Sequence, residues 1–300
     1  MQPTLSVIIV TFNAETQIER AIQTVLAQTF ENIELIIIDG ASTDNTVSKI
    51  QLFNQSKIRW ISEPDTGIYD AMNKGVAMAS GEWVYFLGSD DVLLDESVFH
   101  SVFSTFDTTG IQIIYGNVIS KSFKGKYDGQ FTYKKLLSKN LPHQAAFYRR
   151  SLFQSIGQFN TKFKLHADWD FNLRCFENNV TSHYTETVVA EFGAGGASRN
   201  HDICFLQESL LYRSIQYFNN SGQSRKVSMR EYDQYWRLIR NARVRSADKL
   251  ILYAGGNPIP DFLLRIVKIQ KKIPDNFLQK GLISKGVMAL CFVWNKRVSD

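Results

Sequence analysis

The first 95 residues alternate short, continuous apolar runs with segments in which apolar residues recur at helical spacing. The runs are rich in β-branched residues and too short for typical helices, a pattern typical of parallel strands buried on both faces. We therefore predict an α/β fold with a doubly wound, mostly parallel sheet of the Rossmann-like type. The four runs are Leu5–Val10, Ile33–Ile38, Ile58–Ile61 and Trp83–Leu87.

Polar side chains follow each of these runs at the point where the expected strand ends. Because the carboxyl ends of parallel strands meet at one edge of a sheet, where ligands bind in such folds, we expect these groups to form one site. The first turn has no GxGxxG pattern, so a dinucleotide-dependent dehydrogenase is not indicated. The polar groups are Thr11 and Asn13, Asp39, Asp65, and the pair Asp90 and Asp91.

The most informative of these turns is Gly88-Ser89-Asp90-Asp91. Paired carboxylates can bind a hard divalent cation such as Mg²⁺ or Mn²⁺, and the oxygens of a nucleoside diphosphate can complete the metal's coordination shell. One carboxylate would then bind the metal while the other meets a ribose or sugar hydroxyl. The alternative interpretation is an ordinary turn, or the cap of a helix that begins near Asp95.

Several segments, taken in order along the chain, resemble the family-two glycosyltransferases, which have the GT-A fold. The segment from Ser6 to Asn13 is similar to the family's opening strand and its TYN turn, and that from Ala27 to Asp39 to its QTY…EIIVVDDGSTD stretch. Asp65 to Gly75 and Ala79 to Asp91 resemble its GxxxAxNxGxxxAxGE…FLDSDD block. Ala167-Asp168-Trp-Asp-Phe-Asn-Leu-Arg resembles the EDYDLWLR block, which carries the catalytic base.

This resemblance covers residues 4–176 and is closest to the bacterial branch that builds capsule, exopolysaccharide or O-antigen units. It implies inverting transfer of a sugar from a nucleotide-sugar donor, a UDP-sugar first of all, to a glycan or a polyprenyl-pyrophosphate-linked acceptor. It also implies a divalent cation, Mg²⁺ or Mn²⁺, as the cofactor. The alternative is a non-catalytic sugar-nucleotide-binding or scaffold subunit of a polysaccharide assembly complex.

The resemblance assigns nucleotide contacts position by position. Thr11 and Asn13 would line the nucleotide pocket, and Asp39 would reach the base or the ribose. Where the family often has a second Asp directly after the position of Asp39, this chain has Gly40. We therefore expect one acidic contact to the base to be missing.

Within the acidic pair, the resemblance makes Asp91 the candidate metal ligand and Asp90 a donor contact. Ala167 replaces the Glu of the family's ED pair, so Asp168 is the candidate catalytic base. Inverting transfer requires a carboxylate within reach of the acceptor hydroxyl, which supports this role. The alternative is that Asp168 only caps the helix that follows it. Asp170 is expected to be structural.

The expected helix after Asp65 places Asp70, Asn73 and Lys74 on the face opposite its apolar one. We expect Asn73 and Lys74 to line the donor-sugar pocket beside Asp65. Asp70 and Lys74 are four residues apart, so a surface ion pair is the alternative interpretation. Further candidate acceptor or metal contacts are His143, Gln144 and His201.

The pattern changes after residue 95, where strands are expected at 111–115, 117–122, 143–149 and 182–190, and helices over 202–218 and much of 228–280. Charge and composition shift again near residue 220. We therefore predict a glycosyltransferase domain over residues 1–220 and a basic, mostly helical C-terminal region over residues 221–300. The domain would comprise a nucleotide-sugar half, residues 1–95, and an acceptor half, residues 96–220.

The net charge of +5 is unevenly spread. Residues 1–220 contain 18 Lys and Arg against 23 Asp and Glu, whereas residues 221–300 contain 16 against 6. A basic helix with an apolar face can lie on an anionic membrane surface, and the alternative is that its apolar groups pack on the protein. No nucleic-acid-binding motif accompanies the charge, so no nucleic acid partner is expected. The apolar groups include Phe262, Leu263, Ile266, Val267 and Ile269.

The three cysteines are widely spaced, which indicates reduced thiols rather than a metal site. The N-terminus does not have the pattern of a signal peptide. No apolar run reaches the roughly 18 residues that a membrane-spanning helix needs. We therefore expect a cytoplasmic protein, either free or bound peripherally at the inner face of the cytoplasmic membrane.

Overall fold

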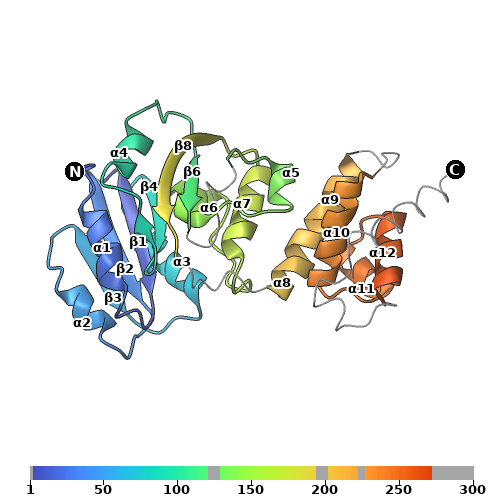
Figure 1. The fold of residues 1–300 in the computed structure, drawn as a ribbon, viewed down its shortest axis with the longest axis horizontal. Helices are drawn as coiled ribbons and strands as arrows, with labels where there is room; N and C mark the ends of the chain where they lie inside the picture. The colour runs from blue at the N-terminus through green and yellow to red at the C-terminus, as the bar shows by residue number, and fades with distance from the viewer. Residues whose placement is uncertain (1–2, 121–128, 194–201, 222–226, 272–300) are drawn as a thin grey trace. The chain divides into compact units, whose positions relative to one another are not determined.

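The computed structural model describes residues 3–120, 129–193, 202–221 and 227–271 (Figure 1). The chain divides into two compact units, Met1–Arg199 and Asn200–Asp300. The first unit contains a mixed sheet with helices on both faces, and the second is helical. The predicted α/β fold with a helical C-terminal extension is therefore confirmed.

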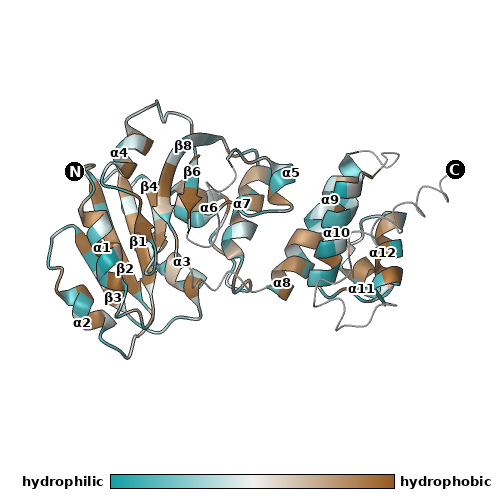
Figure 2. Ribbon diagram, in the orientation of Figure 1, coloured by the Kyte–Doolittle hydropathy of each residue, from teal (hydrophilic) through white to brown (hydrophobic). Residues whose placement is uncertain are grey.

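The first half of the sheet consists of four parallel strands, β1 (Leu5–Thr11), β2 (Ile33–Asp39), β3 (Ile58–Ser62) and β4 (Trp83–Gly88). β1 pairs with β2 on one side and with β4 on the other, and β3 pairs with the outer side of β2. Side chains of β1, β2 and β4 are almost all buried, as expected for strands covered on both faces. Figure 2 shows these three strands as mostly hydrophobic.

The sheet continues with β7 (Ala146–Arg149), β6 (Ile113–Ile119), β8 (Ser182–Glu191) and β5 (Val92–Leu93), in the order β3-β2-β1-β4-β7-β6-β8-β5. The pairs β4–β7, β7–β6 and β8–β5 are antiparallel, and β6–β8 is parallel. The two strands expected at 111–115 and 117–122 form the single strand β6. Gly116, which interrupts the apolar run, allows β8 to approach, because a Cβ there would lie 2.4 Å from the Thr187 carbonyl oxygen.

Helices cover both faces of the parallel half. α1 (Ile18–Leu26) and α4 (Val98–Phe103) share one apolar cluster with β1, β2 and β4. On the other face, α3 (Ile68–Met78) approaches β1 so closely that a Cβ on Gly75 would lie 2.4 Å from Ile8 Cγ2. α7 (Ala167–Glu177) lies on this second face as well, since Phe171 packs on Phe159, which packs on Phe86 of β4. The remaining helices are α2 (Thr46–Gln51), α5 (Tyr133–Leu136) and α6 (Leu152–Ser155).

A short 3₁₀ turn, η1 (His143–Ala145), leads directly into β7. The sequence pattern predicted a strand over 143–149, but the strand begins at Ala146. Pro142 precedes the turn with φ −65° and accepts a hydrogen bond from the Ala145 amide (3.0 Å). Because β7 pairs with both β4 and β6, the turn is attached to the interior of the sheet.

The second unit consists of α8 (Ile203–Phe205), a π-helical turn (Leu206–Leu211), α9 (Tyr212–Asn220), α10 (Met229–Asn241), α11 (Ala247–Ala254) and α12 (Asp261–Lys271). The expected boundary at residue 220 falls at the end of α9, whereas the compact unit begins at Asn200. The charge of the chain changes near residue 220, but the packing of the chain changes about 20 residues earlier.

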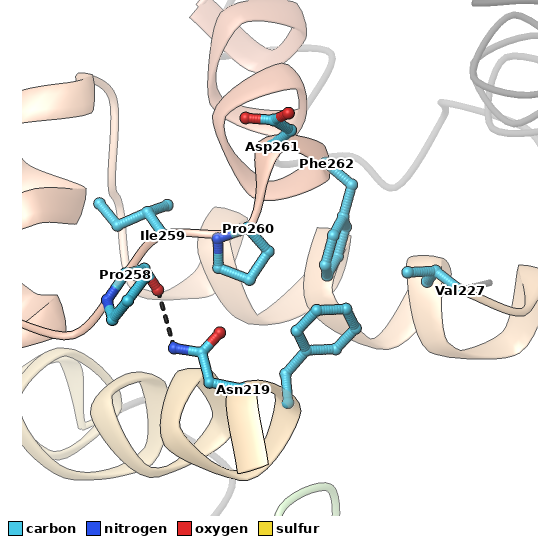
Figure 3. A pocket seen from close by; sticks show the side chains of 8 residues that line it. Asn219, Val227, Pro258, Ile259, Pro260, Asp261 and Phe262 are labelled. Carbon is cyan, nitrogen blue, oxygen red and sulfur yellow. Dashed lines mark hydrogen bonds between the residues drawn. The ribbon is translucent and has the colours of Figure 1, made fainter. Parts of the chain in front are cut away.

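Four of the five apolar residues of α12 that the sequence offered as membrane contacts are buried inside the second unit, and Ile269 is partly buried. The four buried residues are Phe262, Leu263, Ile266 and Val267. The Phe262 ring lies 4.9 Å from that of Phe218 and 5.2 Å from that of Tyr235. Phe262 also lines a cavity of about 370 Å³, together with Asn219 and Pro258. Figure 3 shows these side chains and the hydrogen bond from Asn219 to the Pro258 carbonyl, which measures 2.8 Å in the structure. These contacts favour the packing interpretation for α12.

Candidate active site

The ends of β2 and β3 are joined through the buried carboxylate of Asp39. It accepts hydrogen bonds from the backbone amide of Ser42 (2.9 Å), from the Ser42 hydroxyl, and from the Ser62 hydroxyl (2.6 Å). Asn13, with a left-handed φ of 48°, connects the β1 and β2 loops, because its Oδ1 accepts from the Thr43 amide (2.9 Å). Asp39 and Asn13, both predicted to contact the nucleotide-sugar donor, therefore hold the loops at this edge of the sheet together.

Thr11 differs from these braced groups. It is 5% exposed, and its Oγ1 makes no hydrogen bond with any residue that the structure describes. A buried hydroxyl without a partner costs free energy, so such a group favours a ligand that supplies the missing partner. The neighbouring Phe12 ring is 62% exposed at the same strand end. This strand end therefore combines an unsatisfied hydroxyl with an open aromatic face.

Asp65 occupies the space beside Gly40. A Cβ on Gly40 would lie 2.5 Å from Asp65 Oδ2 and 3.4 Å from the Phe12 ring. The other oxygen, Oδ1, accepts a hydrogen bond from the Gly67 amide (2.8 Å), which orients the carboxylate. The chain has Gly40 where the family often has a second Asp. The carboxylate of Asp65, from the loop after β3, lies beside Gly40, close to where a side chain at residue 40 would begin.

Asn73 and Lys74 of α3 make contacts that tie the helix to neighbouring loops. The Asn73 amide pairs with both backbone groups of Phe159, at 2.9 and 3.0 Å. The Lys74 ammonium lies 2.9 Å from Glu63 and 4.0 Å from Asp70, so the expected Asp70–Lys74 pair is present but is the longer contact. A hydrogen bond to Glu63, partly opposed by burial, raises the pKa of Lys74. The donor role of both residues stays a prediction.

The acidic pair lies directly after β4. Asp91 is 3% exposed and accepts three hydrogen bonds: Oδ2 from the Gly88 amide (3.2 Å) and Gln144 Nε2 (3.1 Å), and Oδ1 from the Gly193 amide (3.0 Å). Burial and the neighbouring charge of Asp91 raise the pKa of Asp90. Two partly desolvated carboxylates side by side are unfavourable without positive charge, which a divalent cation would provide.

Two glycines make room for these carboxylates. A Cβ on Gly88 would lie 2.6 Å from Asp91 Oδ2, and a Cβ on Gly193 would lie 2.7 Å from Asp90 Oδ2. No cluster of three or more His, Cys, Asp or Glu that could hold a metal occurs among the described residues. A cation here would therefore need the oxygens of the diphosphate in addition to Asp90 and Asp91. The further candidate His201 lies outside the described residues.

Asp168 lies in the first turn of α7 and is 4% exposed. Its Oδ1 accepts a hydrogen bond from the Tyr69 hydroxyl (2.7 Å), and its Oδ2 from Asn140 Nδ2 (2.8 Å) and His143 Nδ1 (3.4 Å). None of these donors belongs to its own helix, so the interpretation of Asp168 as a simple helix cap is wrong. Asp170, by contrast, pairs with Arg174 (2.9 Å), and its expected structural role is confirmed.

The pKa values of Asp168 and His143 shift in opposite directions. Burial alone would raise the pKa of Asp168, but the hydrogen bond and charge of His143, and the Tyr69 hydroxyl, outweigh it and lower this pKa. Burial would lower the pKa of His143, but the bonded Asp168 and the charges of Asp91 and Asp90 raise it. Asp168 is therefore ionised near neutral pH.

A cavity of about 340 Å³ opens beside Asp168. The sequence patterns had indicated His143 and Gln144 as candidate contacts, but gave no signal for Tyr69 and Asn140, which lie 99 and 28 residues from Asp168. The walls of this cavity combine hydrogen-bonding groups with aromatic rings, as in sites that bind sugars or other polar organic molecules. The lining includes Tyr69, Asn140, His143, Asp168, Trp169 and Phe192.

Residues 6–172 match the family model described as glycosyl transferase family 2. This match covers more than half of the chain. The chain belongs to this family. It is 37% identical over 204 residues to a "PGL/p-HBAD biosynthesis glycosyltransferase" of Mycobacterium bovis (strain BCG / Pasteur 1173P2), a match that covers 66% of this chain and 80% of the relative.

Solved structures agree with the family at the level of the fold. The Staphylococcus aureus TarS 1-349 complex with UDP-GlcNAc superposes with a TM-score of 0.57 at 15% identity, covering 90% of this chain and 92% of that one. The mannosyltransferase PcManGT from Pyrobaculum calidifontis, in complex with GDP-Man and Mn²⁺, gives a TM-score of 0.56 at 17% identity, covering 99% and 88%. The family-2 glycosyltransferase is thus an enzyme with the GT-A fold, as its sequence motifs implied.

Proposed function

We propose that this family-2 glycosyltransferase transfers a sugar from a nucleotide-sugar donor, a UDP-sugar first of all, to a glycan or polyprenyl-pyrophosphate-linked acceptor. The transfer would invert the configuration at the anomeric carbon and would serve the synthesis of a bacterial surface glycan. One observation carries the proposal: Gln144 binds Asp91, and its neighbour His143 binds Asp168. Inverting transfer needs stabilisation of the departing diphosphate and a base at the acceptor hydroxyl. The two adjacent residues connect the groups suited to these tasks.

Asp168 would accept the proton of the acceptor hydroxyl while the new C1–O bond forms and the bond to the diphosphate breaks. Its lowered pKa keeps the carboxylate ionised and able to accept. Trp169 and Phe192 line the same cavity and would exclude water from the reacting hydroxyl. A divalent cation, Mg²⁺ or Mn²⁺, held by Asp91 with Asp90, would supply the positive charge that stabilises the diphosphate.

The nucleotide is proposed to lie across the ends of β1, β2 and β3. Thr11 supports this placement most directly, because its buried hydroxyl lacks a partner among the described residues. The similar structures of TarS and PcManGT are complexes with UDP-GlcNAc and with GDP-Man and Mn²⁺, which supports a nucleotide-sugar donor. The other proposed donor contacts are Asn13, Asp39, Asp65, Asn73, Lys74 and Asp90.

A donor screen tests the function. The purified chain is incubated with a panel of UDP-, GDP- and dTDP-sugars, with and without Mn²⁺, and release of the nucleoside diphosphate is measured. We expect cation-dependent release from at least one donor, with the Asp91→Asn variant inactive. Binding of a sugar nucleotide without any turnover, in the presence of acceptor glycolipid extracts, would instead support the non-catalytic scaffold subunit.

Peripheral attachment to an anionic membrane is a separate proposal, supported by the basic balance of residues 221–300. No helix among the described residues is long and apolar enough to cross a bilayer. The buried side chains of α12 are not available for insertion. Two exposed apolar side chains of α11, Ile251 and Leu252, lie near Lys249 in the sequence and could enter the interface.

A further inference from the structure

The turn η1 places two adjacent side chains on two different carboxylates. Gln144 Nε2 lies 3.1 Å from Asp91 Oδ2, and His143 Nδ1 lies 3.4 Å from Asp168 Oδ2. We infer that His143 and Gln144 are paired positioning residues. They determine which oxygen of each carboxylate stays open, and they keep the base Asp168 at a fixed distance from the acidic pair. This inference rests on the proposed transfer reaction.

The turn itself is held firmly. The Gln144 carbonyl accepts a hydrogen bond from the hydroxyl of Tyr85 (2.9 Å), a fully buried residue of β4. Ala145 and Ala146, the next two residues, are also fully buried. The chain then enters β7 between β4 and β6. The C-terminal end of the turn is therefore fixed by the sheet, which holds the backbone of Gln144 in place.

The hydrogen bonds select one oxygen on each carboxylate. An ionised carboxylate offers about four lone-pair positions, two on each oxygen. Among the described residues, two donors, Asn140 and His143, bind Asp168 Oδ2, whereas one donor, Tyr69, binds Oδ1. One position on Oδ1 therefore remains for the proton of an acceptor hydroxyl.

Asp91 shows the same arrangement. In the part of the chain that the structure describes, its Oδ2 receives two donors, the Gly88 amide and Gln144, and its Oδ1 receives one, the Gly193 amide. One position on Oδ1 remains for a cation. In both carboxylates, the side chain from η1 fills the second lone-pair position on Oδ2. The same turn therefore determines that Oδ1 is the oxygen with an open position.

Neither side chain needs to exchange a proton in this role. Gln144 does not titrate, and His143 can donate from Nδ1 both when its ring is protonated and when it is neutral as the Nδ1–H tautomer. Loss of either donor would leave one position on Oδ2 without a partner, and the carboxylate would be held by two hydrogen bonds instead of three. The consequence differs between the two residues, because one carboxylate serves the acceptor proton and the other the cation.

Shape-matched substitutions test the pair. His143→Leu removes the donor, while His143→Asn has nearly the same shape as Leu and retains an amide donor near the position of Nδ1. We expect His143→Leu to lower kcat about 10- to 100-fold with little change in the KM for the donor, as for loss of a buried hydrogen bond to a charge. His143→Asn should recover most of that loss.

Gln144→Met keeps the side-chain length and removes the amide. We expect it to raise the Mn²⁺ concentration for half-maximal activity about 10- to 100-fold, the usual cost of losing a partner that orients a metal ligand. At saturating Mn²⁺ its kcat should return close to that of the wild type. The exposed His100→Leu serves as the control and should change neither parameter.

The outcomes separate the inference from the proposed function. If His143→Leu and Gln144→Met changed kcat and the Mn²⁺ concentration for half-maximal activity to the same extent, the turn would be loosened generally. That result would overturn the inference. Activity of His143→Asn as low as that of His143→Leu would also overturn it, because the ring itself would then take part in proton transfer. If a variant does not fold by circular dichroism, Asn140→Leu, which removes the donor to the same Asp168 oxygen, and Asn140→Gln, which keeps an amide donor, replace the His143 pair. A wild type without turnover would defeat the proposed function instead.

Discussion

The hydroxyl of Tyr69 offers the most local perturbation of the proposed base. It donates to Asp168 Oδ1 at 2.7 Å, and it also lies 3.0 Å from the Leu165 carbonyl. Tyr69→Phe removes this hydroxyl and keeps the ring, which packs on Phe159 at 5.6 Å. Since a hydrogen bond to a buried charge contributes about 1.5–3 kcal/mol, the free energy of unfolding near neutral pH should fall by about that amount.

The sign of the pH dependence follows from the direction of the pKa shift. The folded-state pKa of Asp168 is lowered, so its contribution to stability is complete above the unfolded-state pKa of about 3.9 and is lost as pH falls through the folded-state pKa. Tyr69→Phe removes a donor to the charged form and therefore raises the pKa of Asp168. The stability difference between wild type and variant should be constant from about pH 8 to pH 5 and should narrow below about pH 4.

Urea unfolding followed by fluorescence at several pH values measures this difference. The matched control is Tyr133→Phe, because Tyr133 makes a hydrogen bond of the same 2.7 Å length to the exposed carboxylate of Glu177. An exposed pair contributes about 0–1 kcal/mol, so this control should change stability little. Equal losses in the two variants, or a difference that widens in acid, would refute the account of how Asp168 is held.

Three further predictions concern the site and the second unit. Asp168→Asn should lower kcat about 10²- to 10⁴-fold while calorimetry shows nearly unchanged donor affinity, and lost donor affinity would make Asp168 a donor or structural residue. Gly193→Ala should weaken activation by Mn²⁺ about 10-fold or more, because the added Cβ would lie 2.7 Å from Asp90 Oδ2, and an unchanged Mn²⁺ dependence would contradict this. Ile251→Ser with Leu252→Ser should reduce flotation with anionic liposomes at low salt, and equal flotation of this variant would exclude α11 as the contact.

Much of the parallel half of the sheet could be predicted from the sequence. β1, β2 and β4 are buried on both faces, so each appears as a continuous apolar run that local composition reveals. β6 was divided wrongly at Gly116, because the reason for this glycine is the approach of Thr187 of β8, about 70 residues away. A local pattern does not contain that contact.

The site was predictable where its residues follow strands, and not where distant segments converge. Asp39, Asp65 and the acidic pair follow strand ends, so their common edge could be inferred from the alternation alone. Tyr69 meets Asp168 only through the packing of α3 and α7 on the same face of the sheet, and Asn140 reaches it from the loop between α5 and η1. Burial of the apolar face of α12 could likewise not be predicted, since a basic amphipathic helix has the same sequence pattern on a membrane surface and inside a helical unit.

The central claim is sugar transfer that depends on a divalent cation at the acidic pair. The most direct test measures nucleoside diphosphate release from the best donor, with Mn²⁺ and with excess EDTA, for the wild type and for Asp91→Asn. The account predicts release by the wild type with Mn²⁺, loss of release in EDTA, and no release by the folded variant at any Mn²⁺ concentration. Full turnover in EDTA, or by Asp91→Asn, would contradict it.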